Sequence, residues 1–392
     1  MPRNLEILII YLTALMQGLA LVALPAASSV FTDSQHFNFS TSQYGTLFIP
    51  QVLMSILAAF LAPRLSLTWG KKSVYQVGIV LNIISMGLMA LSQLFVRTPS
   101  IAYGCLFFST TAMGAAFGTT LPMINVYAQR FFPQNPAGAL TGLHTLLGTG
   151  TAIAPLLVIV LVKGAGWWLM PLGSFLILAL ILLFSFSLPL KAENSQTNDP
   201  VQKKKFIFSN ELKLFMLIVF LYGFCETIFS NWSIIYLSKE KSVSVDEAGY
   251  ALSIFWAMVT GGRLLTSLLS TWVAPSWFYR ILPIIIAIAL WMVTTIHNPT
   301  MGIIYFGLAG LACSAFFPLT FSFAQSRNPA SAELVSGFLM AFYMLGYGFG
   351  SYGIGMMMPW LGISLQGVYQ ASIAVAIGVI ILSFILTKQK QP

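Results

Sequence analysis

The sequence predicts an all-helical integral membrane protein with twelve transmembrane helices in two pseudo-symmetric six-helix bundles. Composition, the number of long apolar runs and a repeat between the two halves predict this fold. Of the 392 residues, 57% are hydrophobic and 7% are charged, and the mean hydropathy is +0.85. A soluble domain carries about 25% charged residues. Because so few charges cannot cover a water-exposed surface, a soluble enzyme is excluded.

The apolar runs set the number of membrane spans, since each span needs roughly 20 mostly apolar residues. The first run is expected to be retained, because no small-residue cleavage site follows it as in a signal peptide. The expected spans are 6–30, 43–63, 73–95, 100–126, 138–162, 167–188, 212–237, 247–273, 279–296, 300–325, 333–358 and 367–387.

A polar stretch near mid-chain divides the spans into two groups of six. Residues 191–211 read KAENSQTNDPVQKKKFIFSNE, which predicts a flexible charged linker. The expected domains are therefore an N-terminal bundle over 1–190 and a C-terminal bundle over 212–392.

The basic residues are distributed unevenly between the two sides of the expected membrane. Of the 19 lysines and arginines, four fall on the side away from the termini: Arg97, Lys163, Lys239 and Lys241. By the positive-inside rule, both termini and the linker are cytoplasmic. This bias explains the net charge of +9 without a nucleic-acid partner.

The two halves also repeat a short pattern. Pro122, Ala128 and Gln129 recur as Pro318, Ala324 and Gln325 at a constant offset of 196 residues. Residues 147–150 (LGTG) similarly resemble 345–348 (LGYG). Duplicated six-helix halves predict two parallel bundles with a central cavity between them at mid-membrane.

Twelve spans, a cytoplasmic linker and a repeat of six resemble the major facilitator superfamily over essentially the whole chain. Its basic loop between spans two and three is matched by Gly70-Lys71-Lys72, although an expected Asp is missing. Within the superfamily the chain is most similar to the fucose–galactose–proton symporter and sugar permease group. The matching residues are Glu226, Trp232 and Tyr236 on span seven, Phe255-Trp256 through Gly262-Arg263 on span eight, and Pro122 to Asn125 on span four.

The resemblance implies a secondary active transporter that moves a small polar solute, sugar-like or another metabolite, across the bacterial inner membrane. It implies alternating access and proton-coupled symport, with no cofactor beyond the ion gradient. The alternative is a proton-driven exporter of an amphipathic compound such as a drug or siderophore, because the Gly-Pro motif of exporters is partly matched around Pro155. The expected partners are a small-molecule substrate and the lipid bilayer, and we expect a monomer that binds no nucleic acid.

Glu226 is the principal candidate for proton coupling or substrate binding. It is the one acid that falls well inside an expected span, and charges in membrane spans are costly and usually functional. Tyr222, Glu226, Ser230 and Ser233 follow helical spacing and form one expected polar stripe, with Asn231 beside it. An apolar environment favours the protonated carboxyl. Glu226 therefore either binds a proton or substrate, or stays protonated and hydrogen-bonds a neighbouring helix.

Further candidates are polar or aromatic side chains inside expected spans. Gln17 is expected at the position of the first half that is equivalent to Glu226, as a ligand contact or as a link between helices. His144 is either a proton relay or ligand, or a packing histidine. Trp256, Tyr343 and Tyr347 could stack on a sugar or another flat solute, or simply pack. Asn125 either contacts substrate or hydrogen-bonds at its helix end.

A gating role is expected for residues near the cytoplasmic ends of the spans. Arg263 is expected to pair with Glu333 rather than bind substrate, and Arg130 belongs to the same group. Gln129 and Gln325 are either gate residues or helix-end hydrogen-bonding groups. No catalytic constellation appears, and the scattered cysteines and histidines predict no metal site.

Overall fold

The computed structural model describes residues 2–190, 209–328 and 331–388, and within these ranges the chain is helical and contains no strand. In this part of the chain, 12 helical stretches are long and apolar enough to cross a membrane, which confirms the expected number. Residues 191–208 of the linker predicted over 191–211 lie outside the described residues, and its last two residues belong to the first turn of the next helix.

The first half contains the helices up to Ser187. They are α1 (Pro2–Ala26), α2 (Ser28–Thr32), α3 (Thr41–Thr46), α4 (Phe48–Thr68), α5 (Lys71–Leu91), η1 (Ser92–Phe95), α6 (Pro99–Phe131), α7 (Pro136–Gly164) and α8 (Leu169–Ser187).

The second half begins at Asn210, slightly before the expected residue 212. It contains α9 (Asn210–Asn231), α10 (Ser233–Glu240), α11 (Val245–Leu269), α12 (Pro275–Thr294), α13 (Pro299–Cys313), α14 (Phe316–Arg327), α15 (Ala332–Gly348), η3 (Phe349–Gly353), α16 (Ile354–Leu361) and α17 (Leu365–Lys388).

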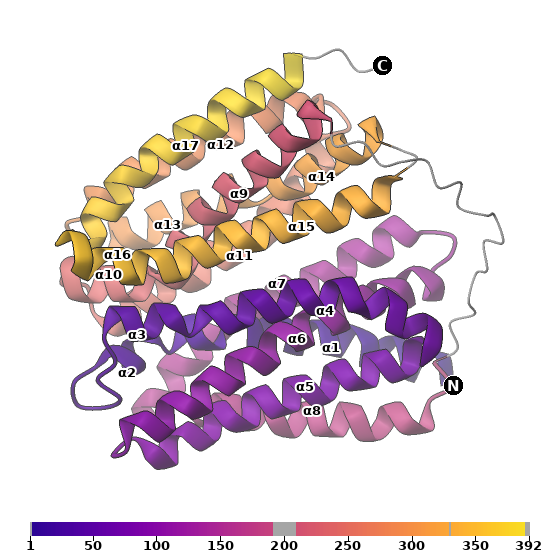
Figure 1. Ribbon diagram of the computed structural model, residues 1–392, viewed down its shortest axis with the longest axis horizontal. Coiled ribbons are helices and arrows are strands. Elements are labelled where there is room, and N and C mark those ends of the chain that lie inside the picture. Colours follow the sequence, from indigo (N-terminus) through magenta and orange to yellow (C-terminus); the bar gives the residue numbers. More distant parts are fainter. Residues whose placement is uncertain (1, 191–208, 329–330, 389–392) are drawn as a thin grey trace.

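The two halves form separate bundles that lie side by side (Figure 1). The first residues of α1 and the last residues of α17 lie at the same end of the molecule, which we call the terminus end. The short helices α2, α3, α10 and α16 gather at the opposite end, which we call the far end (Figure 1).

Four expected spans are interrupted in the structure. The expected helices over 6–30 and 43–63 break at Ala27 and Leu47, between α1 and α2 and between α3 and α4. The expected helix over 212–237 breaks at Trp232, so that α9 and α10 are separate helices. The expected helix over 300–325 breaks at Ser314 and Ala315, between α13 and α14. A count of apolar residues gives no signal at these breaks, but Pro318 marks the one before α14, because a proline has no N–H for the carbonyl four residues earlier, that of Ser314.

Asn-Pro pairs begin helices of both halves. The side chain of Asn135 accepts a hydrogen bond from the backbone N–H of Gly138 at the start of α7, and Asn298 accepts one from Met301 at the start of α13. Pro136 and Pro299 follow as the first helical residues, where a missing N–H costs nothing. These pairs therefore fix where α7 and α13 begin.

Glycines at equivalent places bring equivalent helices into backbone contact. A Cβ atom on Gly150 would overlap the carbonyl oxygen of Leu15 on α1, and one on Gly346 would overlap that of Phe220 on α9. Gly18 and Gly223 make the reciprocal approaches to α7 and α15. The duplication is therefore visible in the packing of the helices. In this packing Gly150 corresponds to Gly346 and not to Gly348, so the expected match of 147–150 to 345–348 was wrong by two residues.

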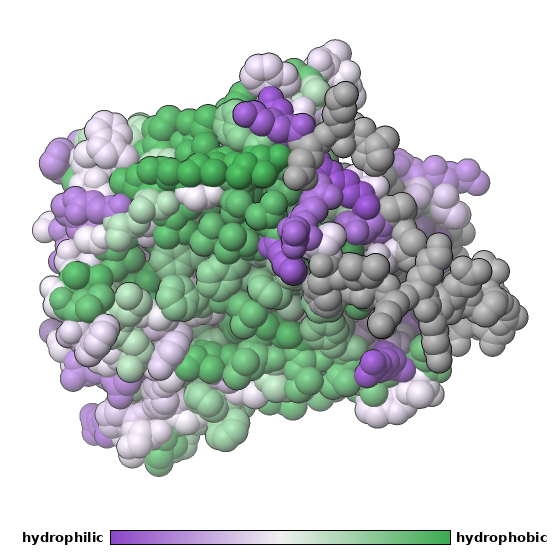
Figure 2. All heavy atoms as spheres, turned by 45° about the horizontal axis from the view of Figure 1, so that its top comes forward, coloured by the Kyte–Doolittle hydropathy of each residue, from purple (hydrophilic) through white to green (hydrophobic). Residues whose placement is uncertain are grey.

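The outer flank of the molecule is apolar. Figure 2 shows hydrophobic residues over the flank, with hydrophilic ones gathered toward the ends. Val160, Leu183 and Ile304 on different helices are each more than half exposed. A surface of this kind is stable in contact with lipid chains and not in water.

Candidate functional site

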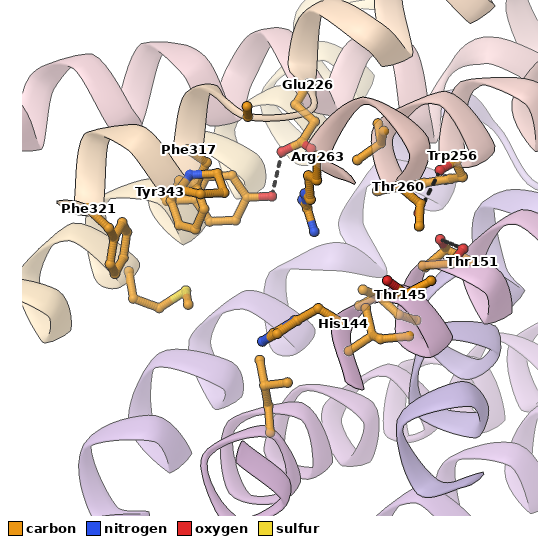
Figure 3. Close-up of a pocket in the computed structure, with 18 of the residues that line it drawn as sticks. His144, Thr145, Thr151, Glu226, Trp256, Thr260, Arg263, Phe317, Phe321 and Tyr343 are labelled. Atoms are coloured by element: carbon orange, nitrogen blue, oxygen red, sulfur yellow. Dashed lines mark hydrogen bonds between the residues drawn. The ribbon is translucent and has the colours of Figure 1, made fainter. Parts of the chain in front are cut away.

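A cavity of about 810 Å³ lies between the two halves. It is lined by α1, α4, α6 and α7 of the first half and by α9, α11, α14 and α15 of the second. Figure 3 shows side chains from both halves pointing into this space. A pocket of this size can enclose most of a drug-sized solute.

Glu226 lines the cavity near the end of α9 and is only 3% exposed. The hydroxyl of Tyr343 on α15 donates a 2.6 Å hydrogen bond to its Oε2 atom. Among the described residues, Glu226 has no ion-pair partner. The helix ends at Asn231, so Glu226 lies closer to the end of its helix than the expected span placed it. The carboxyl group therefore lies at the cavity wall with Arg263 as a nearby positive charge that is not bonded to it.

Asn231 connects the cavity to the far end. Its Nδ2 atom donates to the hydroxyls of Tyr347 (2.9 Å) and Ser351 (2.8 Å). Its backbone carbonyl accepts a hydrogen bond from Tyr44 of the first half at 3.0 Å. Asn231 and Tyr347 thus lie beside the cavity, as expected for site residues, but their side chains bond to each other.

Arg263 on α11 points into the cavity, and its position depends on the break between α13 and α14. Its Nε–H donates to the carbonyl of Ser314 at 3.0 Å. Tyr222 donates to the neighbouring carbonyl of Cys313 at 2.7 Å. The break frees these two carbonyls from helical bonding, and the two side chains satisfy them. The expected pairing of Arg263 with Glu333 cannot be followed, because the Glu333 side chain lies outside the described part of the chain.

His144 faces Arg263 across the boundary between the halves (Figure 3). Gly148 on α7 lies against Thr260 on α11 so closely that a Cβ atom would overlap the threonine hydroxyl. The two helices run in opposite directions, so one turn toward the terminus end leads to His144 on α7 and Arg263 on α11. Close backbone packing therefore brings these two side chains together.

Three further expected residues also line the cavity. Trp256 lies on α11, and its indole Nε1 atom is buried with no hydrogen-bond partner among the described residues. Asn125 on α6 has a buried Oδ1 atom that also has no hydrogen-bond partner among the described residues. Gln325 on α14 lies toward the terminus end and donates to Ser336 at 2.6 Å. Trp256 and Asn125 therefore each have a polar atom that no described residue hydrogen-bonds.

Four other expected residues do not line the cavity. Tyr222 is fully buried inside the second bundle, Gln129 is exposed, and Arg130 lies in the last turn of α6. Gln17 is also fully buried, and its Oε1 atom accepts a hydrogen bond from Asn82 at 2.8 Å.

The position of Gln17 follows from the packing of the glycines. Gly18 corresponds to Gly223, so Gln17 corresponds to Tyr222, and the expected match to Glu226 was wrong by about one helical turn. The residue that corresponds to Glu226 is Leu21, which does line the cavity.

Several lining residues were not expected from the sequence. Gln51 and Ser55 on α4 share one face of their helix, and Phe317 and Phe321 do so on α14. Each pair is spaced by one helical turn. That spacing was the available signal, but it also occurs in ordinary packing faces, so it does not single out a cavity.

Polar contacts join the two halves toward the far end. Ser42 donates to the carbonyl of Gly355 at 2.9 Å, and Lys239 donates to that of Thr32 at 3.0 Å. Lys163 and Asp246 form an ion pair. The cavity lining, in contrast, extends toward the terminus end through residues such as Gln325 and Ser270. The halves are therefore fastened at the far end, and the cavity reaches toward the terminus end.

Comparison with known proteins gives consistent matches. The model of the Major Facilitator Superfamily matches residues 7–351. The tetracycline resistance protein, class B, of Escherichia coli is 28% identical over 198 residues, which are 48% of this chain and 46% of that protein. The matched region thus spans about half the length of this curated relative.

Solved structures share the fold along almost the whole chain. A mutant of the nucleoside transporter NupG superposes with a TM-score of 0.79 at 15% identity, covering 98% of this chain and 99% of that one. A bacterial homologue of the human lysosomal transporter Spinster, in an inward-facing and occupied conformation, gives 0.73 at 16% identity, covering 99% and 97%.

Proposed function

The chain belongs to the major facilitator superfamily, and we propose that it is a secondary active transporter that moves a small solute by alternating access and proton symport. The observation that carries this proposal is the cavity between the halves, where Glu226 lies in the wall under a hydrogen bond from Tyr343. A carboxyl group so placed gains or loses a proton according to its access to water.

The arrangement of contacts between the halves supports alternating access. The two halves are held together at the far end by hydrogen bonds from Ser42 and Lys239 and by the ion pair of Asp246. With the terminus end in the cytoplasm, as the positive-inside rule predicts, these contacts and the reach of the cavity support a state open toward the cytoplasm. Transport then requires that these far-end contacts break and that new ones form at the terminus end. The bacterial inner membrane and a monomeric state remain part of the proposal.

Glu226→Gln tests the coupling role. Proteoliposomes with an inward proton gradient receive a panel of labelled sugars, nucleosides and monocarboxylates. We expect the wild type to accumulate at least one solute above its external concentration, whereas the variant only equilibrates it, because a glutamine cannot bind and release a proton.

A matched control comes from an acid away from the cavity. Glu247 belongs to the capping box at the start of α11, and a glutamine can replace a glutamate there. Glu247→Gln should accumulate the solute like the wild type. Undiminished accumulation in Glu226→Gln would refute the coupling role of Glu226, and no accumulation in the wild type would refute proton symport.

Export is the second candidate, because the curated relative is a tetracycline resistance protein. The same liposomes distinguish the two directions. An exporter that exchanges protons for solute expels a preloaded solute when the outside is acidic, whereas a symporter accumulates it under that gradient. The resemblance to the sugar permease group favours symport.

A further inference from the structure

We propose that the solute is an organic anion, whose carboxylate is held between Arg263 of the second half and His144 of the first. This inference rests on the proposed function, because it names the class of solute that the same cavity binds. It concerns binding alone and does not require proton coupling.

The accessible charge in the cavity is positive. Arg263 is partly exposed, whereas Glu226 is only 3% exposed and its Oε2 atom accepts the Tyr343 hydroxyl. Arg263 uses its Nε–H to bind the Ser314 carbonyl. Its two terminal nitrogens make no hydrogen bond or ion pair with a described residue. They point into the space between the halves (Figure 3). The edge formed by these two nitrogens suits a carboxylate.

His144 adds a second donor from the other half. Its ring points into the same space as Arg263 (Figure 3), and it makes no hydrogen bond with a described residue. An imidazole donates an N–H in either of its protonation states. A carboxylate bound by both side chains would bridge the two halves, so its binding depends on how the halves are arranged.

The break before α14 also favours a negative group. Ala315, Phe317 and Pro318, at the start of this 12-residue helix, line the cavity. The N-terminus of a helix carries a partial positive charge, and interrupted membrane helices bind anionic groups of solutes in this way. Together with Arg263, this start makes the wall of the second half electropositive at the cavity.

The rest of the wall suits an apolar body. Phe317 and Phe321 on α14 and Met340 and Met344 on α15 line one side of the cavity. Aromatic and thioether side chains adapt to flat apolar groups. The free indole N–H of Trp256 provides one more donor. The expected occupant is therefore an aromatic or otherwise apolar carboxylate, rather than a small inorganic anion.

Thermal unfolding of the purified full-length protein in detergent tests this inference, because a bound ligand raises the apparent unfolding temperature. Acids are compared with their own amides: benzoate with benzamide, 2-naphthoate with 2-naphthamide, and indole-3-acetate with indole-3-acetamide. Inorganic phosphate and phenethylamine serve as the bare anion and the cation. We expect at least one acid to stabilise the wild type at a concentration about tenfold below that needed for its amide.

Three variants attribute the preference to the cavity. Arg263→Gln should remove it while leaving a donor for the Ser314 carbonyl, and His144→Phe should weaken it while keeping the guanidinium. Arg280→Gln removes a cation that binds Thr387 away from the cavity and should leave the preference intact.

Several outcomes would overturn the inference. Among the ligands, it would be overturned if no acid stabilised the protein, if the amides or phosphate stabilised it as well as the acids, or if phenethylamine stabilised it more. Among the variants, it would be overturned if Arg263→Gln kept the preference for acids over amides. The proposed function is tested separately. If acids bind as expected but Glu226→Gln still accumulates solute, the coupling role of Glu226 fails and the anion site stands.

Discussion

Glu226 shows how neighbours define the role of a single polar residue. The sequence indicates that a carboxyl lies in a span, but Tyr343 donates to it from a helix more than 100 residues later in the chain. Such a contact depends on how α9 and α15 pack, so sequence spacing could not predict it. Trp256, Tyr343 and His144 were predicted as candidates because polar and aromatic groups are conspicuous inside apolar runs.

Arg263 was interpreted from the sequence as a gating residue, and its surroundings lead to a different proposal. Its depth along α11 was predictable, since each helical residue advances about 1.5 Å. Its use of the Ser314 carbonyl was not predictable, because it depends on how α11 packs against the break between α13 and α14. Pro318 alone shows that this carbonyl lacks its helical donor. The proposed role as an anion contact depends on that break.

Tyr343→Phe tests the hydrogen bond to Glu226. The variant loses the donor while keeping the ring, and a bond to a charged group contributes about 1.5–3 kcal/mol. We expect a clear loss of gradient-driven accumulation, measured as uptake in proteoliposomes, with normal yield of folded protein.

Tyr369→Phe is the matched control. It removes a buried hydroxyl that donates to the Ile228 carbonyl at 2.9 Å, away from the cavity lining. This variant should lose about 1 kcal/mol of stability and keep its coupling. Equal losses of uptake in both variants would mean that the Tyr343 hydroxyl acts only in stability.

At the level of elements, most helices were predictable because apolar length dominates the signal in a membrane protein. Their starts were also predictable where an Asn-Pro pair or a capping box marks them, as at Asn135 and Ser244. The interruptions were not predicted, and they fall beside the cavity at Trp232, at Ser314 and in the π-helix η3. Pro318 is a local signal for the break at Ser314, because it has no N–H for that carbonyl. The break at Trp232 has no such proline and is stabilised by packing from other helices.

Gly148→Ala tests the contact between α7 and α11. The added methyl group would overlap the hydroxyl of Thr260 on the other half. Overpacking of this kind costs about 1–3 kcal/mol. We expect a lower unfolding temperature and slower transport.

Two further variants locate this effect. Gly148→Ala combined with Thr260→Ala should recover much of the stability, because the second change removes the overlapping atom. Gly104→Ala, at a position with open space around it, should behave like the wild type. A Gly148→Ala variant as stable and active as Gly104→Ala would show that the helices separate there without cost.

At the scale of the whole molecule, the duplicated architecture follows from the repeat, although its register was partly wrong. The offset of 196 residues holds for Gly150 and Gly346, but it does not transfer to the first helix of each half. There Gly18 corresponds to Gly223, which moves the partner of Glu226 from Gln17 to Leu21. Insertions between helices change the offset, and only the packing reveals the correct alignment.

Labelling of single cysteines tests the proposed sidedness. In a variant without the native Cys105, Cys225 and Cys313, Ser270→Cys places a thiol in the cavity lining toward the terminus end, and His36→Cys places one at the far end. A membrane-impermeant maleimide should label the first from the cytoplasmic side and the second from the opposite side. The reverse labelling pattern would show that the far end, and not the terminus end, faces the cytoplasm.

The central claim is that Glu226 carries the proton that moves with the solute. The most direct measurement is the pH inside proteoliposomes, recorded with an entrapped dye, when a transported solute is added outside without an imposed proton gradient. The account predicts that solute entry acidifies the lumen with the wild type, and that Glu226→Gln lets solute equilibrate with no acidification. Equal acidification with both proteins, or solute entry without acidification in the wild type, would contradict it.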